Sequence, residues 1–479
     1  MRIKALLTTN FIRIATFASV ACVASIAGAQ SLQQKLQTAY NRLQQDSQCR
    51  YASLSLTVLD VKTGETVFTA NPNMGLATAS TLKTITSITA FNILGKDFQY
   101  QTQFGYSGSI AADGTLNGDL IIKGAGDPTL GSWRYSGHRE NDILTQMVTA
   151  LQKAGIKKIN GRVIGDDSIF GTQSIPDGWI WMDVGNYYGA GTSGLCWREN
   201  QFDIKLKTGA VNSPIGIIRT VPNTPYLNFK SELLNAPSGS GDNAYGYLPV
   251  GTKLMYLRGT YAEDQEKRSI SVAIPDPAFD AAFRLTDTLK RLGILVTGEP
   301  ESILTLNAKG QLSPAIGNNL ATILSPTLSQ IVYWLNQKSI NLYAEQLLKT
   351  IAWKSGKPAL TQNGVEVEQD FWKARGIDPN ALNVVDGSGL SPGDRVTTLT
   401  MATVLRSAKN TDWFPDFYQS LPVYNNMKMK SGSILNVLTY AGYQNHSGRE
   451  LCFSIMVNNF YGSSRGIKEK MFKVLDELK

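Results

Sequence analysis

Histidine is the scarcest useful residue in this 479-residue chain, which contains only His138 and His446. There is no H-E-x-x-H sequence and no cluster of cysteine and histidine, which argues against a zinc peptidase. A Ser-His-Asp triad would need one of the two histidines, and no G-x-S-x-G elbow accompanies them. We therefore expect no metal or cofactor, and the general base must be another residue type.

Long apolar runs are also lacking. A membrane span needs about 18 or more uninterrupted apolar residues, and no segment of the chain reaches this length. Near the N-terminus, Arg2, Lys4 and Arg13 supply positive charge, residues 14–26 are apolar or small, and Ala27-Gly28-Ala29 forms an A-x-A sequence. This arrangement is typical of an export signal with a cleavage site. It predicts that residues 1–29 are removed and that the mature protein is periplasmic, without stable membrane insertion.

Strong net charge is absent as well. The formal charge is +8, and three of the positive charges lie in the predicted signal peptide. No basic run and no interleaving of basic and aromatic residues indicates nucleic-acid binding. The mild positive charge suits weak attraction to anionic cell-wall material, and dispersed solubilising charge explains it equally well.

Cysteine is rare too. Three cysteines remain after the predicted cleavage, namely Cys49, Cys196 and Cys452. An odd number leaves at least one thiol free in an exported protein. Whether any two of them pair stays open, and Cys452 lies in an apolar, strand-like segment that predicts a buried, inert thiol.

Against these absences stands Ser80-Thr81-Leu82-Lys83. Apolar residues recur at three-residue spacing through residues 79–94, which predicts a helix with one buried stripe (Leu82, Ile85, Ile88 and Phe91). Positions i and i+3 share a helix face, so the Ser80 hydroxyl and the Lys83 amine can come within hydrogen-bonding reach. The positive helix dipole in the first turn favours a neutral lysine, which can accept the hydroxyl proton. A chance pairing of serine and lysine is the alternative.

Two further short motifs follow in the chain. Ser339-Ile340-Asn341 comes after a helix-like stretch over residues 328–335, and Lys430-Ser431-Gly432-Ser433 lies on an alternating segment that predicts a strand. The order S-x-x-K, S-x-N and K-[TS]-G is the signature of penicillin-binding proteins and active-site serine β-lactamases. Each motif is weak alone, whereas three in this order are strong evidence.

Longer strings narrow the resemblance. They lie at residues 124–130 (GAGDPTL), 161–170 (GRVIGDDSIF), 341–345 (NLYAE) and 386–391 (DGSGLS). Together they resemble the low-molecular-mass class C penicillin-binding proteins, the D-alanyl-D-alanine carboxypeptidase/endopeptidase group typified by penicillin-binding protein 4 (peptidase family S13), over residues 54–458. The resemblance implies an α+β fold of the penicillin-recognising serine transpeptidase/β-lactamase-like type, an antiparallel sheet flanked by helices.

The motif spacing predicts where additional chain is inserted. About 255 residues separate Lys83 from Ser339, far more than the fold needs between these motifs. We expect a catalytic domain in two parts, residues 30–95 and 277–479, interrupted by a mainly β insertion over residues 96–276. The family resemblance implies that the insertion consists of two nested domains.

The motifs imply an acyl-transfer mechanism. Ser80 is the candidate nucleophile and Lys83 its base. The resemblance further implies that Ser339 passes a proton to the leaving nitrogen and that Asn341 orients Lys83 and the substrate amide. The alternative for Ser339 and Asn341 is a helix cap or a turn, since both residue types favour such positions.

The third motif is expected to bind substrate. The Lys430 charge can hold a terminal carboxylate with help from the Ser431 hydroxyl, and Gly432 lets a substrate backbone lie close to the strand. Ser431 stands where the family usually has threonine, so the hydroxyl is kept. By analogy, the backbone N–H groups of Ser80 and Ser433 form the oxyanion hole.

One departure affects specificity. Relatives often carry an arginine directly after Gly-Leu-Ser, whereas Pro392-Gly393 follows here and Arg395 comes later. In the family, an arginine there and an aspartate of the insertion bind the diamino acid side chain of the stem peptide. Arg395 with Asp166 or Asp167 are the candidates, and the alternative is that these charges cap local turns.

The sequence thus predicts a serine-type D-Ala-D-Ala carboxypeptidase, a D,D-endopeptidase or both, acting on peptidoglycan stem peptides through an acyl-serine and acylated by β-lactam antibiotics. A β-lactamase-like hydrolase is one alternative, although the E-x-x-L-N loop of class A enzymes is absent. A non-catalytic cell-wall-binding protein is the other, although every motif hydroxyl and lysine is present. The balance between carboxypeptidase and endopeptidase activity and the oligomeric state stay open.

Overall fold

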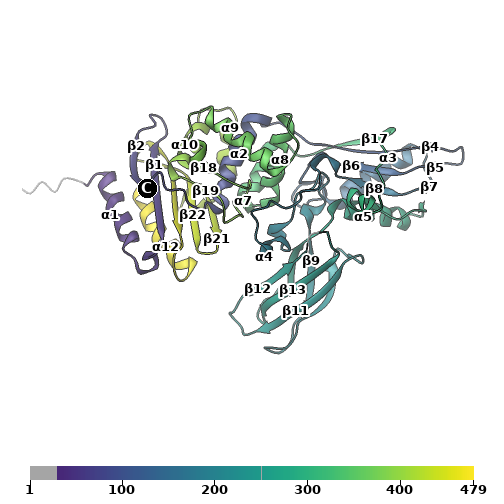
Figure 1. Cartoon of the computed structure of the whole chain (residues 1–479), viewed down its shortest axis with the longest axis horizontal. Coiled ribbons are helices and arrows are strands. Elements are labelled where there is room, and N and C mark those ends of the chain that lie inside the picture. The colour runs from purple at the N-terminus through teal and green to yellow at the C-terminus, as the bar shows by residue number, and fades with distance from the viewer. Residues whose placement is uncertain (1–29, 250) are drawn as a thin grey trace, which may run out of the picture.

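The computed structural model describes residues 30–249 and 251–479, so the predicted signal peptide lies outside the described residues. One end of the molecule is built on a six-stranded antiparallel sheet (Figure 1). Its strands run in the order β2 (Thr66–Ala70), β1 (Ser53–Asp60), β23 (Arg449–Asn458), β22 (Val437–His446), β21 (Met427–Ile434) and β20 (Val423–Tyr424). No helix in the described part of the chain is long and apolar enough to cross a bilayer.

Helices cover both faces of this sheet. The terminal helices α1 (Leu32–Gln44) and α12 (Ser464–Leu475) enclose one apolar core against it. The other face carries a second, larger core, closed by α2 (Leu82–Leu94), α7 (Leu328–Lys338), α8 (Asn341–Lys354), α9 (Thr361–Lys373), α10 (Thr398–Ala408) and α11 (Phe414–Ser420). The short pair β18 (Leu382–Asn383) and β19 (Arg395–Val396) lies beside them. The predicted α+β architecture is confirmed.

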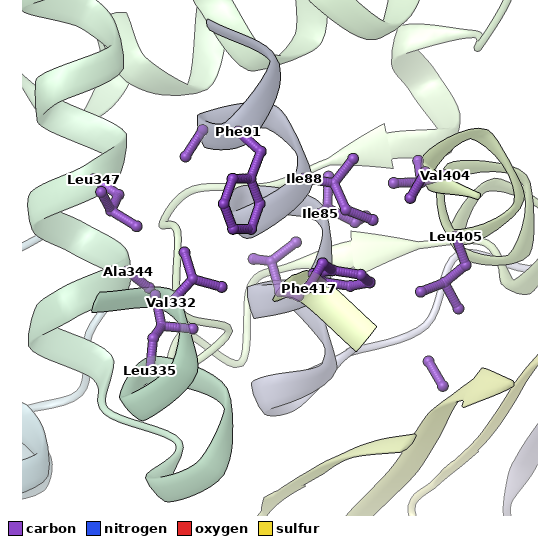
Figure 2. Packing of buried hydrophobic residues seen from close by; sticks show 14 of the residues in the cluster. Ile85, Ile88, Phe91, Val332, Leu335, Ala344, Leu347, Val404, Leu405 and Phe417 are labelled. Carbon is purple, nitrogen blue, oxygen red and sulfur yellow. The ribbon is translucent and has the colours of Figure 1, made fainter. Parts of the chain in front are cut away.

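Helix α2 lies at the centre of the larger core. Figure 2 shows Ile85, Ile88 and Phe91 surrounded by side chains of α7, α8, α10 and α11. The sequence predicted one buried stripe, but every residue from Leu82 to Phe91 is buried. The polar positions tolerate burial because their hydroxyl groups form hydrogen bonds with backbone carbonyls. Thr89 donates to the Ile85 carbonyl (2.8 Å), and Thr86 donates to the Gly387 carbonyl (2.7 Å). A helix held on all sides is a rigid support for the nucleophile.

The chain between α2 and α7 forms two further units. The first contains a five-stranded sheet in the order β16 (Glu301–Ser302), β8 (Val163–Asp166), β6 (Leu120–Lys123), β3 (Gln101–Tyr106) and β17 (Asn318–Leu324). A four-stranded sheet follows the order β15 (Leu295–Val296), β7 (Lys158–Asn160), β5 (Thr115–Asn117) and β4 (Ser109–Ile110). These sheets share one apolar core with α3 (Glu140–Lys153) and α5 (Pro277–Arg291), and α6 (Ile303–Ala308) follows β16.

The second unit lies within the first along the chain and is all β apart from a short helix at its base, α4 (Trp181–Val184). It pairs two three-stranded sheets around its own core: β10 (Gly216–Val221), β9 (Gln201–Lys207) and β14 (Ser269–Ala273), then β11 (Asn228–Ala236), β13 (Leu254–Ala262) and β12 (Asp242–Tyr247). Figure 1 shows this unit projecting away from the six-stranded sheet.

The packing differs from the predicted boundary at residue 276. Strand β17 pairs with β3, and β15 and β16 pair in parallel with β7 and β8. Residues 277–324 therefore lie with the first inserted unit, whereas the sequence predicted that the catalytic domain resumes at residue 277. The cause is non-local pairing: these short strands close sheets begun about 140 to 220 residues earlier, and short strands carry no sequence mark of their partners.

Candidate active site

Lys83 is the centre of the site and is completely buried. Its Nζ lies 2.9 Å from Ser80 Oγ, 2.5 Å from Asn341 Oδ1 and 2.7 Å from the Ser388 carbonyl oxygen. Ser80 lies in the 3-10 turn Ala79–Thr81, directly before α2, and Asn341 is the first residue of α8. The structure thus brings the first two predicted motifs into direct contact.

These three contacts define where a proton can move. The Ser388 carbonyl only accepts, and Asn341 Oδ1 also faces Lys83 as an acceptor because its Nδ2 donates to the Tyr188 carbonyl (2.7 Å). A neutral amine has two N–H groups, and these two acceptors use both. Its lone pair is then left for Ser80, whose hydroxyl can donate to it. The geometry makes Lys83 a base toward Ser80 alone.

Electrostatics support the same assignment. Burial lowers the pKa of Lys83 to about 7, although the nearby carboxyl groups of Asp386, Glu345 and Asp394 oppose this shift. An amine with this pKa is substantially neutral at neutral pH, as a general base requires.

The loop that follows β18 carries two of these carboxyl groups, those of Asp386 and Asp394. Asp386 accepts from the N–H groups of Ser388 (3.1 Å), Gly389 (2.6 Å) and Ser391 (2.8 Å), and from the Trp179 indole (2.9 Å). Gly389 has φ +76°, and a Cβ there would lie 1.9 Å from the Ala79 carbonyl oxygen. Only glycine lets this loop pack against the turn that carries the nucleophile.

Glu345 joins the loop from α8. Both of its carboxyl oxygens lie 3.1 Å from the Gly387 N–H. Burial, and then the nearby Asp386, raise the pKa of Glu345. The sequence showed Asp386 and Glu345 only as letters of family strings, and it gave no physical sign that they surround Lys83.

The third motif meets the second across the cleft. Lys430, on β21, is buried and its Nζ lies 2.9 Å from Ser339 Oγ and 2.8 Å from the Ser431 carbonyl oxygen. Burial, followed by the charge of Lys83, lowers the pKa of Lys430 well below its usual value. Ser339 ends α7 with φ +55°, a left-handed conformation that turns the chain into α8. Ser339 therefore does occupy a helix cap, and the same turn places its hydroxyl beside Lys430.

The structure gives Gly432 a second reason besides the predicted one. A Cβ at this position would lie 2.5 Å from Thr439 Oγ1, 2.6 Å from the Thr78 carbonyl oxygen and 2.7 Å from the Ser80 nitrogen. Thr439, on β22, donates to the same Thr78 carbonyl (2.6 Å). The missing side chain thus makes room for the turn that carries Ser80, and strand β21 fixes the nucleophile directly.

These motifs open into a cleft of about 710 Å³. The predicted residues that line it are Ser80, Ser339, Asn341 and Ser433. The inserted units supply another wall, which includes Asp183, Tyr187, Tyr188 and Tyr245. Asp183 is largely buried and burial raises its pKa, while its hydrogen bond with the Tyr188 hydroxyl acts in the opposite direction. Sequence analysis missed Asp183, because it lies on the four-residue helix α4 outside any motif.

The structure places the three predicted specificity residues elsewhere. Asp166 caps a local turn by accepting from the Ser168 N–H (3.0 Å), and Asp167 accepts from the Ser193 hydroxyl (3.0 Å). Asp167 lines a separate cavity with Asp276, where burial and that neighbour raise its pKa to about 7. Arg395 is exposed and donates to the carbonyls of Pro392 and Asp394. The contacts of Asp166 and Arg395 are local, as the alternative expects, whereas Asp167 contacts a residue 26 positions along the chain. None of the three is among the residues that line the catalytic cleft, and their part in specificity stays a prediction.

The three cysteines of the described residues form no disulfide. Cys49, Cys196 and Cys452 are free and buried, and burial raises the pKa of the Cys452 thiol to about 12. Within residues 30–249 and 251–479, no group of three or more His, Cys, Asp or Glu side chains is arranged to hold a metal ion.

Comparison with known proteins places this geometry in a family. The sequence profile of the D-Ala-D-Ala carboxypeptidase 3 (S13) family matches residues 36–478. The chain is 24% identical to a D-alanyl-D-alanine carboxypeptidase of Actinomadura sp., over 96% of this chain and 87% of that protein. It is 28% identical to the D-alanyl-D-alanine carboxypeptidase DacB of Haemophilus influenzae, over 81% of this chain and 82% of that protein.

Solved structures agree on the fold. The crystal structure of penicillin binding protein 4 from Haemophilus influenzae superposes with a TM-score of 0.76 at 22% identity, covering 91% of this chain and 98% of that one. A structure of the same protein complexed with a β-lactam has a TM-score of 0.70 at 21% identity, covering 92% and 98%. The chain has the penicillin-recognising fold and belongs to the D-Ala-D-Ala carboxypeptidase 3 (S13) family of serine peptidases.

Proposed function

We propose that the protein is a serine D-Ala-D-Ala carboxypeptidase that also cleaves D,D-cross-links of peptidoglycan stem peptides. The observation that carries this proposal is the contact of Ser80 with a buried lysine whose other two partners can only accept. Family membership supports the substrate class. Carboxypeptidase and endopeptidase reactions share the same acyl group, a D-alanyl carbonyl, and differ only in the amine that leaves.

The residues divide the reaction as follows. Lys83 takes the Ser80 proton as Oγ attacks the D-alanyl carbonyl, and the backbone N–H groups of Ser80 and Ser433 stabilise the oxyanion. The C–N bond then breaks as Ser339 passes its proton to the departing nitrogen and takes up the proton held by Lys83, which leaves an ester on Ser80 and a neutral Lys83. Water hydrolyses the ester with Lys83 again as base, which releases the shortened peptide and restores the Ser80 hydroxyl.

Lys430 and Ser431 hold the substrate's terminal carboxylate. Lys430 has two partners, Ser339 Oγ and the Ser431 carbonyl, so one N–H remains for an incoming anion when the lysine is charged. A β-lactam carries a carboxylate in a comparable position, so the same residues direct its ring carbonyl to Ser80. The ester that forms there is the inhibited enzyme, and the relative solved with a β-lactam supports this class of ligand.

We further propose export to the periplasm through residues 1–29, where the substrate occurs. Expressing the full chain and sequencing the N-terminus of the mature product tests this. Cleavage after Ala29 is expected, and an intact N-terminus in an exported protein would contradict it.

The decisive test of function is Ser80→Ala. The variant should lose labelling by fluorescent penicillin and all release of D-alanine from a pentapeptide, while its circular dichroism and melting temperature stay unchanged. Stoichiometric labelling of a folded Ser80→Ala protein would overturn the nucleophile. In the wild type, rapid loss of the label would favour the β-lactamase alternative, and no labelling with no product would favour a binding protein. Mass analysis of digested muropeptides separates the two peptidase activities.

Substrate side-chain recognition is assigned to the wall of the cleft formed by the inserted units. We infer that Asp183 receives the free amine of the diamino acid, since its carboxyl lines the same cleft as Ser80 and lies beside Tyr188. A buried carboxyl is stabilised in its charged form by an ammonium partner. Arg395 has an indirect part at most, because its guanidinium binds the backbone of Pro392, which lines the cleft.

The matched variants are Asp183→Asn and Asp167→Asn. The first should lower kcat/KM about tenfold for a stem peptide with a free diamino acid amine and leave an N-acetylated version nearly unchanged. The second variant changes a buried aspartate outside the cleft and should leave kcat/KM unchanged for both peptides. Equal losses on both peptides with Asp183→Asn would show that its role is structural.

A further inference from the structure

A second groove adjoins the catalytic cleft. It encloses about 490 Å³ between α7, α11 and the loop before α3. The lining includes Arg134, Tyr333, Trp334, Gln330, Asp416 and Gln419. Arg134 also lines the catalytic cleft, and α7 runs from the groove to Ser339, so the two spaces are continuous along one helix.

The groove presents aromatic faces around a fixed cation. The guanidinium carbon of Arg134 lies 5.6 Å from the centre of the Trp334 ring, which lines the groove. It lies 5.4 Å from the ring centre of Trp133, which is its neighbour in the chain and is not part of the groove lining. Tyr333 and Trp334 form an edge-to-face pair with ring centres 5.3 Å apart. Trp133 is 45% exposed, and Trp334 is only partly buried. Aromatic rings of this kind, apolar on the face and wet at one edge, are typical of ligand-binding surfaces.

Strained backbone holds Arg134 in place. Glu199 is buried and receives Arg134 Nε at 2.8 Å and its Nη2 at 3.2 Å, together with the Tyr343 hydroxyl at 2.9 Å. Three consecutive residues that include it, Arg198, Glu199 and Asn200, have φ between +53° and +55°. Such conformations cost of order 1–3 kcal/mol each and cluster at functional sites. Because Tyr343 belongs to α8, two residues after Asn341, the same contact ties the groove to the active site.

The charges of the groove do not favour an anionic occupant. Glu199 pairs with Arg134, and the lining also holds the His138 imidazole and the Asp416 carboxylate, which accepts from the Ser329 hydroxyl (3.0 Å). The Asp416 carboxylate would repel the carboxylates of a stem peptide. A neutral ring with hydroxyl and amide groups would instead stack on the aromatic faces and bond with Gln330 or Gln419. A stem of about four residues spans at most roughly 14 Å, so its sugar must lie near the cleft during catalysis.

We propose that this groove is a subsite for the N-acetylated disaccharide of peptidoglycan, placed so that a glycan-linked stem peptide reaches Ser80. The proposal rests on the proposed function. The subsite extends the proposed function, because it assigns the binding of the glycan to Trp334, Tyr333 and the ion pair Arg134–Glu199. The glycan itself takes no part in the chemistry.

Two substrates test it: a disaccharide pentapeptide, and the same pentapeptide without its sugars. Trp334→Ala should raise KM for the first about tenfold with kcat unchanged, and should leave KM for the second within twofold. Trp334→Phe keeps a ring and should restore most of the difference. The matched control is Trp353→Ala, an exposed tryptophan on α8 outside the groove, which should change neither KM.

Equal rises of KM for both substrates would show that the groove binds peptide, and an unchanged KM for both in a folded Trp334→Ala protein would also overturn the proposal. If the wild type cleaves neither substrate, the proposed function fails. The glycan subsite is then decided by retention of the Ser80→Ala protein on isolated cell walls. Adding Trp334→Ala should reduce that retention severalfold and adding Trp353→Ala should not; equal retention would overturn it.

Discussion

The two buried lysines of the cleft have the same side chain but opposite surroundings. Around Lys83, the carboxyl groups of Asp386, Glu345 and Asp394 oppose desolvation and hold its pKa at about 7. The groups that act on Lys430, within the described residues, include no carboxylate; burial lowers its pKa and the charge of Lys83 lowers it further. One lysine is already tuned as a base near neutral pH, whereas the other lacks an anionic partner until a ligand brings one.

Position in the fold explains the difference. Lys83 lies on a helix enclosed by α7, α8, α9 and α10. The Glu345 carboxyl reaches it from α8, and those of Asp386 and Asp394 reach it from the loop after β18. Lys430 lies on β21, where its neighbours are a hydroxyl and a backbone carbonyl. A general base needs a neutral amine with a free lone pair, and an anion-binding lysine needs a free N–H group for the incoming carboxylate. The two environments therefore suit two different roles.

The largest effect is expected when Lys83 can no longer act as a base. Lys83→Arg keeps a positive charge but cannot lose its proton at useful pH. It should reduce the acylation rate at least about 1000-fold, nearly as much as Lys83→Ala, because general-base catalysis supplies factors of this order. Stopped-flow penicillin acylation measures this, with the melting temperature as the control for folding. Near-normal acylation by Lys83→Arg would leave Lys83 an electrostatic role only.

The next effect concerns Lys430. Lys430→Ala should lower kcat/KM about 10- to 100-fold for peptides that end in a free D-Ala carboxylate, the range expected for a charged hydrogen bond. An analogue with an amidated terminus should lose much less. Lys428→Ala, two residues earlier on the same strand, should change neither substrate. A loss of equal size on both peptides would mean that Lys430 supports the site rather than the carboxylate.

Local patterns predicted the parts of this site that local structure determines. The spacing of Ser80 and Lys83 follows from one helical turn, and Lys430 from an alternating strand, so both were visible in the sequence. Asp183 reaches the cleft only because α4 packs against it from the inserted units, and residues 277–324 join the first insert through non-local strand pairing. Contacts between segments so far apart leave no periodic signal, so the sequence could indicate neither the place of Asp183 nor that of residues 277–324.

The pH dependence sharpens the comparison at Lys83. Its pKa is lowered to about 7, so the amine is neutral and active above pH 7 and charged and inactive below it. The kcat/KM for acylation should therefore fall about tenfold per pH unit below pH 7. Residual acylation by Lys83→Arg should lack this limb. A wild-type profile that stays flat down to pH 5, or that rises only above pH 9, would contradict the assignment of Lys83 as the base.

The smallest expected effect is a proton taken up by Lys430. Burial and the charge of Lys83 lower the pKa of Lys430, whereas a bound carboxylate stabilises its charged form, so binding should raise this pKa. Titration calorimetry of the Ser80→Ala protein at pH 7.5, in buffers of different ionisation enthalpy, measures the uptake without chemistry. We expect up to one proton per bound peptide with a free D-Ala terminus, and less with the amidated analogue. The difference should vanish in the double variant with Lys430→Ala. Equal uptake for both peptides would place the proton on another group, Lys83 being the nearest, and would remove the distinction between a tuned base and a waiting receptor.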